Sequence, residues 1–593
     1  MPQPIAGKLN LTDIPIEVLL DNLLPVIPVP DLLNLLCCNK FFSVLCTDDT
    51  VWKRKLSEDF NFSGQGTART SGWKFIYRGL FKPRVFVWGE KTHGRLGLPN
   101  VPKSVVPGLP YPMQVPLPNV RIVSLVAGGM SFHALDSDGS VHVWGSLDGR
   151  AYRPKQVTTP HRLSLPVPIR SISCGRLHSS CLDRTNKIWT FTNWDRPFCL
   201  SSPILSDPEY APKQIECGWT FSSLLTKSGD VFVWWPFGGS MGQAVEQKMR
   251  DMDQETDTRA YATTDSKTIH CKTWDLDMVP TRLPQLPALP ELPDIGDVNN
   301  AQHITLIQIA AFDNHIVGLT NRGHVLKYGS LHDETGVPHG RWEYLPQFSE
   351  VARVKDQPAF SDESNSAKLE APQTMQITHI TANFVNFVAY STGSSSIVLV
   401  GDTSTKPDSP PKIIPELQNR SIISVVIGDY HNAALTATGK LMTWGKYSNG
   451  ALGLGDPLKL EPGTPGGFAD FAARKTAEER RRGEPPAVNV PSEVRFDHNN
   501  KKPRDRFCFA TTAAGWHTGA LVIDLESGEE EEIVQSQSDA SPLIAGPSRS
   551  QWESPPIIPL PGIFRMGHAA RGNFRDGVGG IHRRPQPNDG EPS

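Results

Sequence analysis

Four histidines recur at one position of a repeated sequence frame, and imidazole is a common general base and metal ligand. They are His178, His315, His431 and His517. A ring of such imidazoles would indicate proton transfer or metal binding. However, Ser131, Phe221 and Asn386 occupy the same position in other copies of the frame, and these side chains cannot share one chemistry. We therefore expect the histidines to form hydrogen bonds with neighbouring turns.

The remaining motifs give no sign of an active site. The sequence has no phosphate-binding loop, nucleophile elbow, HExxH helix or dinucleotide fingerprint. The glycine-rich stretch 450–456 follows a Trp-Gly strand instead of opening a helix, so we do not expect it to bind a nucleotide. Nine cysteines are scattered without a CxxC pair or zinc-ligand spacing. We expect a non-catalytic protein without a metal or cofactor.

The frame that carries the histidines is repeated along most of the chain. Most copies run from a glycine through a strand and a tight turn to a second strand, which often ends in Trp-Gly. Copies begin at residues 128, 175, 218, 312, 383, 428 and 514, and the short intervals are about 45 residues. Hairpin units of this length are typical of propeller blades. The long intervals place insertions at 237–300 and 456–506.

The two ends of this region complement each other. The last copy, 514–525, lacks the strand that ends in Trp-Gly, and an orphan strand of that kind, 85–89, precedes the first copy. If both belong to one blade, the ring closes and no sheet edge stays unpaired. We therefore expect removal of residues 1–90 to destabilise the whole propeller and removal of residues 1–75 to leave it intact.

After Trp-Gly, the frame continues as HGRLGL at 93–98 and NGALGL at 449–454. With this continuation, residues 85–525 resemble the regulator of chromosome condensation repeat family, and the resemblance implies a seven-bladed β-propeller. The frame tryptophans are expected to pack within blades; they are Trp88, Trp144, Trp234 and Trp444. Trp194, Trp235 and Trp274 lie off the frame, and we expect them to anchor a protein substrate on the surface.

The first sixty residues follow a different pattern, that of three short helices. Pro15 suits the first turn of a helix, and prolines at 25, 28 and 30 end that helix. A unit of about fifty residues buries little apolar surface by itself. Its many Leu, Phe and Trp side chains must therefore be covered either by the rest of the chain or by a partner.

The order of features in this segment resembles an F-box over residues 9–58. An apolar residue and Pro15 come first, Glu17-Val18-Leu19-Leu20 and Asp31-Leu32-Leu33 follow, and Asn39-Lys40 and Trp52 come last. Ile14 replaces the usual Leu and Phe42 replaces a frequent Trp, so the apolar character is kept. The resemblance implies docking to the Skp-type adaptor of SCF (Skp–cullin–F-box) ubiquitin ligases, and through it to the cullin and RING subunits. The residues expected to contact the adaptor are Ile14, Pro15, Val18, Leu19, Leu32, Leu35, Asn39, Phe42 and Trp52.

Composition limits the other partners. Lys and Arg total 59 against 62 Asp and Glu, and a net charge of −3 does not favour nucleic acid. We expect no membrane span because no apolar run is long enough, and the N-terminus does not resemble a secretory signal. The expected location is therefore the cytoplasm, the nucleus or both. Residues 526–593 open with four glutamates and then become rich in Ser, Pro, Gly and Arg, as expected of a disordered tail.

Together these features predict a mainly β fold. A three-helix F-box domain at 9–58 and a linker at 59–84 precede a seven-bladed β-propeller at 85–525, and a disordered tail follows. The expected function is substrate recognition in an SCF-type E3 ubiquitin ligase, with the propeller binding proteins for ubiquitination and proteasomal degradation. One alternative is a guanine nucleotide exchange factor for a small GTPase, the role of the repeat family's namesake. Another is a scaffold that binds the adaptor without delivering a substrate.

Overall fold

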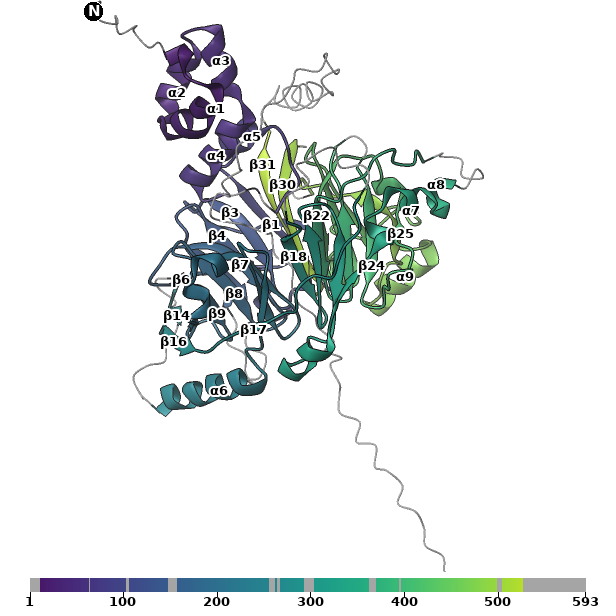
Figure 1. The fold of residues 1–593 in the computed structure, drawn as a ribbon. Coiled ribbons are helices and arrows are strands. Elements are labelled where there is room, and N and C mark those ends of the chain that lie inside the picture. Colours follow the sequence, from purple (N-terminus) through teal and green to yellow (C-terminus); the bar gives the residue numbers. More distant parts are fainter. Residues whose placement is uncertain are drawn as a thin grey trace, which may run out of the picture.

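The computed structural model describes residues 11–62, 64, 66–102, 106–147, 157–254, 262–263, 267–292, 303–361, 369–393, 396–498 and 504–525. The predicted tail, 526–593, and parts of both insertions lie outside these residues. In the described part, the strands form seven sheets, and the sheets form a ring. Helices α1–α5 lie at one end of this ring (Figure 1). The predicted mainly β, seven-bladed propeller with helices before it is confirmed.

Each sheet is one blade, and its strands are given from the ring axis outward. Blade 1 contains β30 (Arg506–Ala514), β31 (His517–Asp524), β1 (Arg84–Gly89) and β2 (Leu109–Gln114). Blade 2 contains β3 (Ile122–Ala127), β4 (Ser131–Asp136), β5 (Val141–Gly145) and β6 (Val157–Ser164). Blade 3 contains β7 (Ile169–Cys174), β8 (Ser179–Asp183), β9 (Ile188–Phe191) and β10 (Phe198–Ser201). Blade 4 contains β11 (Pro212–Cys217), β12 (Ser222–Thr226), β13 (Val231–Trp234) and β17 (Thr281–Arg282).

The remaining blades follow the same plan. Blade 5 contains β18 (Leu306–Phe312), β19 (His315–Thr320), β20 (Val325–Tyr328) and β21 (Trp342–Tyr344). Blade 6 contains β22 (His379–Asn383), β23 (Asn386–Tyr390), β24 (Val398–Asp402) and β25 (Lys412–Ile413). Blade 7 contains β26 (Ile422–Ile427), β27 (His431–Thr436), β28 (Leu441–Gly445) and β29 (Val488–Glu493).

Blade 1 joins the two ends of the propeller, as the orphan strand predicts. β1 pairs antiparallel with β31, with Val85 opposite Leu521 and Trp88 opposite Thr518, and β2 covers the outer edge of β1. The inner strand β30 contacts the inner strands of both neighbours, β3 and β26. The ring is therefore closed by hydrogen bonds between segments more than four hundred residues apart.

Blades stack face to face, which explains why their inner strands are apolar on both sides. Every residue of β3 and of β26 is buried. The frame tryptophans pack within this stack, as predicted: Trp88 and Trp144 are fully buried, and Trp444 is 7% exposed. The tight turn between the second and third strands also fixes one residue type. Gly439 has φ +81°, and a Cβ there would lie 2.3 Å from the Phe507 ring.

The insertion after β13, the third strand of blade 4, supplies strands to the ring as well as a helix outside it. It holds α6 (Gly239–Gln254), which lies at the end of the molecule away from α1–α5 (Figure 1). It also supplies β17, the outermost strand of blade 4. Two more of its strands pair in parallel with strands of other blades. β15 (Thr268–His270) pairs with β6 of blade 2, and β16 (Trp274–Asp277) pairs with β10 of blade 3. The second insertion holds α9 (Phe471–Arg480) and supplies β29.

The N-terminal helices are α1 (Ile16–Val18), α2 (Val29–Leu36), α3 (Lys40–Thr47), α4 (Asp49–Phe60) and α5 (Trp73–Gly79). The last of these lies in the segment 59–84 that we expected to be a linker. Trp73, Phe75 and Ile76 of α5 are all buried, so this segment is a packed element between the first helices and the propeller. Removal of residues 1–75 would therefore strip part of the core, contrary to the expectation that the propeller would be unaffected.

Candidate functional site

Two of the N-terminal helices begin where polar side chains satisfy their first backbone donors. Asn39 caps α3 by accepting a hydrogen bond from the Phe42 backbone N–H at 2.9 Å. Asp48 caps α4 by accepting one from the Thr50 N–H at 2.7 Å. Asn39, predicted to contact an adaptor, thus has a structural role in starting a helix and also stays exposed.

The nine residues predicted to contact an adaptor divide by burial. Four are buried inside the N-terminal helical region, residues 11–81, which we call the module: Leu19, Leu32, Phe42 and Trp52. Ile14 and Leu35 are half-buried, and Pro15, Val18 and Asn39 are exposed. The buried four form the core that holds the helices together, and only the last three offer full contact to another molecule.

Sequence reasoning named Val18 as an adaptor contact but left the other outward-pointing apolar side chains of this region off its list of contacts. Among the described residues, twelve large apolar side chains are exposed, and six of them lie within the first 44 residues. These six are Leu11, Ile16, Val18, Val26, Leu33 and Val44. We call them the exposed apolar set. Leu33 and Val44 are 44% and 68% exposed, and each sits on a helix whose other face is buried.

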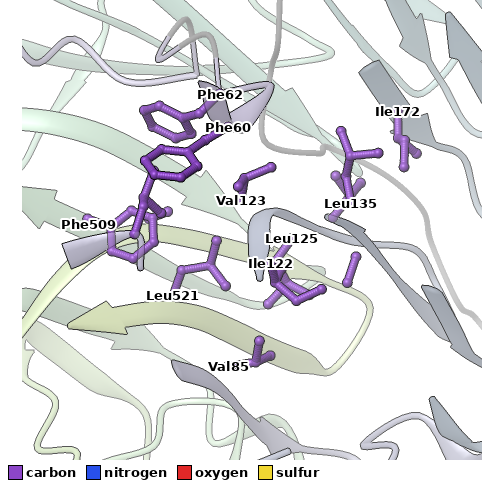
Figure 2. Close-up of a cluster of buried hydrophobic side chains, with 14 of the residues drawn as sticks. Phe60, Phe62, Val85, Ile122, Val123, Leu125, Leu135, Ile172, Phe509 and Leu521 are labelled. Carbon is purple, nitrogen blue, oxygen red and sulfur yellow. The ribbon is translucent and has the colours of Figure 1, made fainter. Parts of the chain in front are cut away.

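The C-terminal half of the module is anchored to the propeller by aromatic contacts. The Arg121 guanidinium, just before β3, lies 4.8 Å from the Phe60 ring and 5.1 Å from the Phe81 ring. Phe62 meets Phe509 of β30 with ring centroids 6.4 Å apart. Figure 2 shows Phe60 and Phe62 above the strands that carry Val123, Phe509 and Leu521. The helices and the propeller therefore share one hydrophobic core.

Polar contacts fix the same junction. Asn61 donates its side-chain N–H to the Ile169 carbonyl of β7 at 3.1 Å. Arg69 donates to the Ala437 carbonyl at 2.8 Å, and burial lowers the pKa of its guanidinium to about 10. Ile169 begins β7 and Ala437 directly follows β27. Both acceptors therefore lie on the face of the ring where the innermost strands begin. The module thus sits on that face of the ring and leaves the opposite face to the remaining loops.

The sequence predicts that the recurring histidines bond neighbouring turns, and three of them instead reach strand residues of the next blade. The Nε2 atom of His178 lies 3.0 Å from the Ser222 hydroxyl of blade 4, and that of His431 lies 2.8 Å from the Thr518 hydroxyl of blade 1. His517 reaches the Ser131 carbonyl of blade 2 at 3.3 Å. Burial lowers the pKa of His178 to about 4 and that of His431 to about 3, so both stay neutral. Half-buried His315 instead contacts the Asp313 carbonyl of its own turn.

The three tryptophans predicted to anchor a substrate are not exposed. Trp194 and Trp235 are each 3% exposed, and the Trp235 indole N–H donates to the Leu331 carbonyl at 3.0 Å. Trp274 of β16 is half-buried against Phe198. The expectation that Trp194 and Trp235 project from the surface is therefore wrong, because both complete the packing beneath a loop.

The described residues were also searched for other kinds of site. They contain no group of three or more His, Cys, Asp or Glu side chains with metal-binding geometry. Within the same described part, no helix has the length and apolar character needed to cross a membrane. Histidines and hydroxyls thus connect blades, while the N-terminal helices leave apolar side chains uncovered.

Comparison with known families decides the nature of the repeat. Residues 84–135 and residues 422–451 each match the family described as regulator of chromosome condensation (RCC1) repeat. The chain therefore contains RCC1-type repeats at these two places. The matches fall on the strands that open the propeller and on its seventh blade.

Two fungal proteins are similar to parts of this chain. SCF-associated factor 1 of Saccharomyces cerevisiae is 34% identical over 138 residues, which are 22% of this chain and 19% of that protein. F-box protein pof9 of Schizosaccharomyces pombe is 27% identical over 149 residues, or 24% of this chain and 28% of that protein. The matches thus span less than a third of either relative. A solved structure of Kap60 bound to yeast RCC1 (Prp20) aligns over 77% of this chain and 92% of its own, with 15% identity and a TM-score of 0.45.

Proposed function

We propose that this protein is the substrate-recognition subunit of an SCF-type ubiquitin ligase. The N-terminal helices bind a Skp-type adaptor, through which the cullin and RING subunits assemble, and the propeller holds a protein substrate. The observation that carries the proposal is the exposed apolar set, in which Leu33 and Val44 lie on helices that bury other residues in the core. The names of the two fungal relatives point to the same assembly.

An exposed apolar set of this kind suits a permanent partner. Apolar surface left in water costs about 25 cal/mol per Å², and contiguous exposed patches mark interaction sites. In this chain the propeller does not cover the set, because all six side chains are exposed and the aromatic contacts with the ring come from later residues such as Phe62 and Phe75. A separate protein with an apolar groove or face would cover it.

The proposed chemistry is proximity. A ligase subunit that binds both an adaptor and a substrate raises the effective concentration of substrate lysines near the ubiquitin-charged enzyme. That role needs no nucleophile or base on this chain. It does need a fixed geometry, and the packing of Arg121 between Phe60 and Phe81 supplies a stiff connection between the two binding regions.

Affinity purification from cells tests the proposal. The tagged full chain is compared with the variant Val18→Asp, Leu33→Asp, Val44→Asp, which places charge on three exposed positions without touching the core. We expect adaptor, cullin and RING subunits to co-purify with the wild type and to be lost from the variant. The bound fraction is also probed for small GTPases. Capture of a nucleotide-free GTPase without any adaptor would overturn the proposal in favour of an exchange factor.

A further inference from the structure

The face of the propeller opposite the helices carries its own cluster of aromatic side chains. Each blade turns there from its innermost strand to the next, and each turn places a half-buried residue beside the ring axis. These residues are Met130, Arg176, Trp219, Asn314, Phe384, Tyr430 and Trp516, and we call them the channel mouth. Four of the seven are aromatic, although the turns come from different blades and share little sequence.

The rings of the channel mouth touch one another across blades. Trp219 of blade 4 stacks on Phe384 of blade 6 with centroids 6.3 Å apart and planes at 30°. Phe384 meets the edge of Tyr430 of blade 7 at 5.5 Å. Because blade 5 lies between blades 4 and 6, the first contact spans the turn of an intervening blade. The rings therefore form a continuous apolar surface over the end of the axis.

Cations lie over two of these rings. The Arg176 guanidinium is 4.4 Å from the Trp219 ring, and the Lys446 ammonium is 4.7 Å from the Tyr430 ring. Lys446 is exposed and Arg176 is half-buried. An aromatic surface flanked by two cations is a favourable contact for apolar groups that carry negative charge nearby.

The acidic side chains at the same turns are less accessible. Asp429 is 2% exposed, and its buried carboxylate interacts with the charge of Arg176. The Asp313 carboxylate accepts a hydrogen bond from the Asn314 side chain at 2.8 Å. At the channel mouth itself, the exposed charge nearest the aromatic rings is therefore the Lys446 ammonium, with the half-buried Arg176 guanidinium beside Trp219.

We infer that the channel mouth is the substrate-binding surface, and that it takes an extended protein segment in which acidic residues flank a large apolar side chain. This inference rests on the proposed function and names the substrate class that the propeller recognises. The apolar side chain packs on Trp219, Phe384 and Tyr430. The acidic residues pair with Arg176 and Lys446, as charge-assisted bonds favour.

The two faces of blade 7 offer a matched pair of variants. Lys440 immediately precedes β28 and Lys446 immediately follows it, so they stand at opposite ends of one strand. Both are exposed, and Lys440 pairs with Glu493 at 3.4 Å. Lys446→Glu reverses a charge at the channel mouth, whereas Lys440→Glu makes the same change on the face that carries the helices.

The test selects a phage-displayed library of random peptides on the immobilised full chain and measures binding of the enriched peptides. We expect enrichment of sequences that combine Asp or Glu with Phe, Leu or Trp. Trp219→Ala should weaken these peptides about 30-fold, the size expected of a central aromatic contact. Lys446→Glu should weaken them about tenfold, and Lys440→Glu should not change them. Circular dichroism melting confirms that each variant is folded.

Three results would overturn the inference: enrichment of basic peptides, equal effects of the two lysine variants, or displacement of bound peptides by single-stranded RNA at matched ionic strength. Capture of the Skp-type adaptor by the same immobilised chain is measured in parallel. Loss of peptide selection with adaptor capture intact contradicts only this inference. Failure to capture the adaptor contradicts the proposed function instead.

Discussion

The N-terminal helices and the propeller differ in how much apolar surface they leave exposed to solvent. The propeller covers itself: β1 enters blade 1 between β31 and β2, and the innermost strands are buried on both sides. The helices leave six large apolar side chains exposed within 34 described residues, while the rest of the described chain exposes six more. The comparison shows that the propeller buries most of its own apolar surface, whereas the helices leave large apolar side chains exposed.

The largest effect should follow from breaking the ring. Deleting residues 1–90 removes β1, which leaves β31 with an unpaired edge and β2 without a partner strand. We expect the propeller to lose its cooperative thermal transition. Deleting residues 1–47 removes α1–α3 and keeps α4 and α5, so the propeller transition should persist. Differential scanning calorimetry of both truncations measures this, and equal melting curves would contradict the closure.

The junction between the two regions should be the next most sensitive place. Phe60→Ala removes a ring that is 3% exposed and contacts Tyr77, Phe81 and Arg121. We expect the free energy of unfolding of the helical region to fall by about 3–5 kcal/mol. Phe471→Ala, at a ring that is 66% exposed on α9, should change it by less than about 0.5 kcal/mol. Urea denaturation followed by limited proteolysis within 14–60 compares the two, and similar curves would show that the junction is loose.

Acid should weaken the propeller through its buried histidines. Burial depresses the pKa of His178 to about 4 from 6.5, so the unfolded chain binds this proton more readily than the folded chain. The stability contributed by the neutral form is complete above pH 6.5 and is lost as the pH falls toward 4. Near pH 5, this histidine should account for a loss of about 2 kcal/mol.

The pH dependence of unfolding isolates this contribution. His178→Gln removes the titrating group, so the slope of stability against pH between about 6 and 5 should become shallower by about 1.2 kcal/mol per pH unit. The matched variant is His332→Gln, because the side chain of His332 is 60% exposed rather than buried between blades. If both variants keep the wild-type slope, the blade-to-blade histidines are not the source of acid sensitivity.

The sequence predicts the ring well because its signal is repeated. Trp88 and Trp144 end equivalent strands, and Gly439 marks a turn that needs a positive φ, so each copy supports the others. The orphan strand at 85–89 even shows where the ends meet. By contrast, α5 appears only once and has no copy to support it. Its role becomes visible when Phe75 packs on Phe507 with ring centroids 4.9 Å apart, a contact between distant segments.

Surface residues are harder to predict, for a physical reason. Apolar residues at helical spacing mark the face that a helix buries, so Leu32 and Phe42 stood out although they form the core of the module. Leu33 and Val44 lie outside that spacing and are the ones left for a partner. Likewise, Trp235 lies off the repeat frame but fills a cavity under the Leu331 loop. Departure from a repeat therefore indicates a local difference in packing as readily as a binding site.

The central claim is that the exposed apolar set of the helices binds a Skp-type adaptor. Isothermal titration calorimetry of purified adaptor with the full chain tests it most directly, using the wild type, the variant Val18→Asp, Leu33→Asp, Val44→Asp, and the control Val490→Asp. Val490 is 52% exposed on the propeller strand β29, so the control carries a comparable change away from the helices. We predict tight binding by the wild type and the control, and at least about 30-fold weaker binding by the triple variant at an unchanged melting temperature. No binding by the wild type, or equal affinity of the triple variant, would contradict the account.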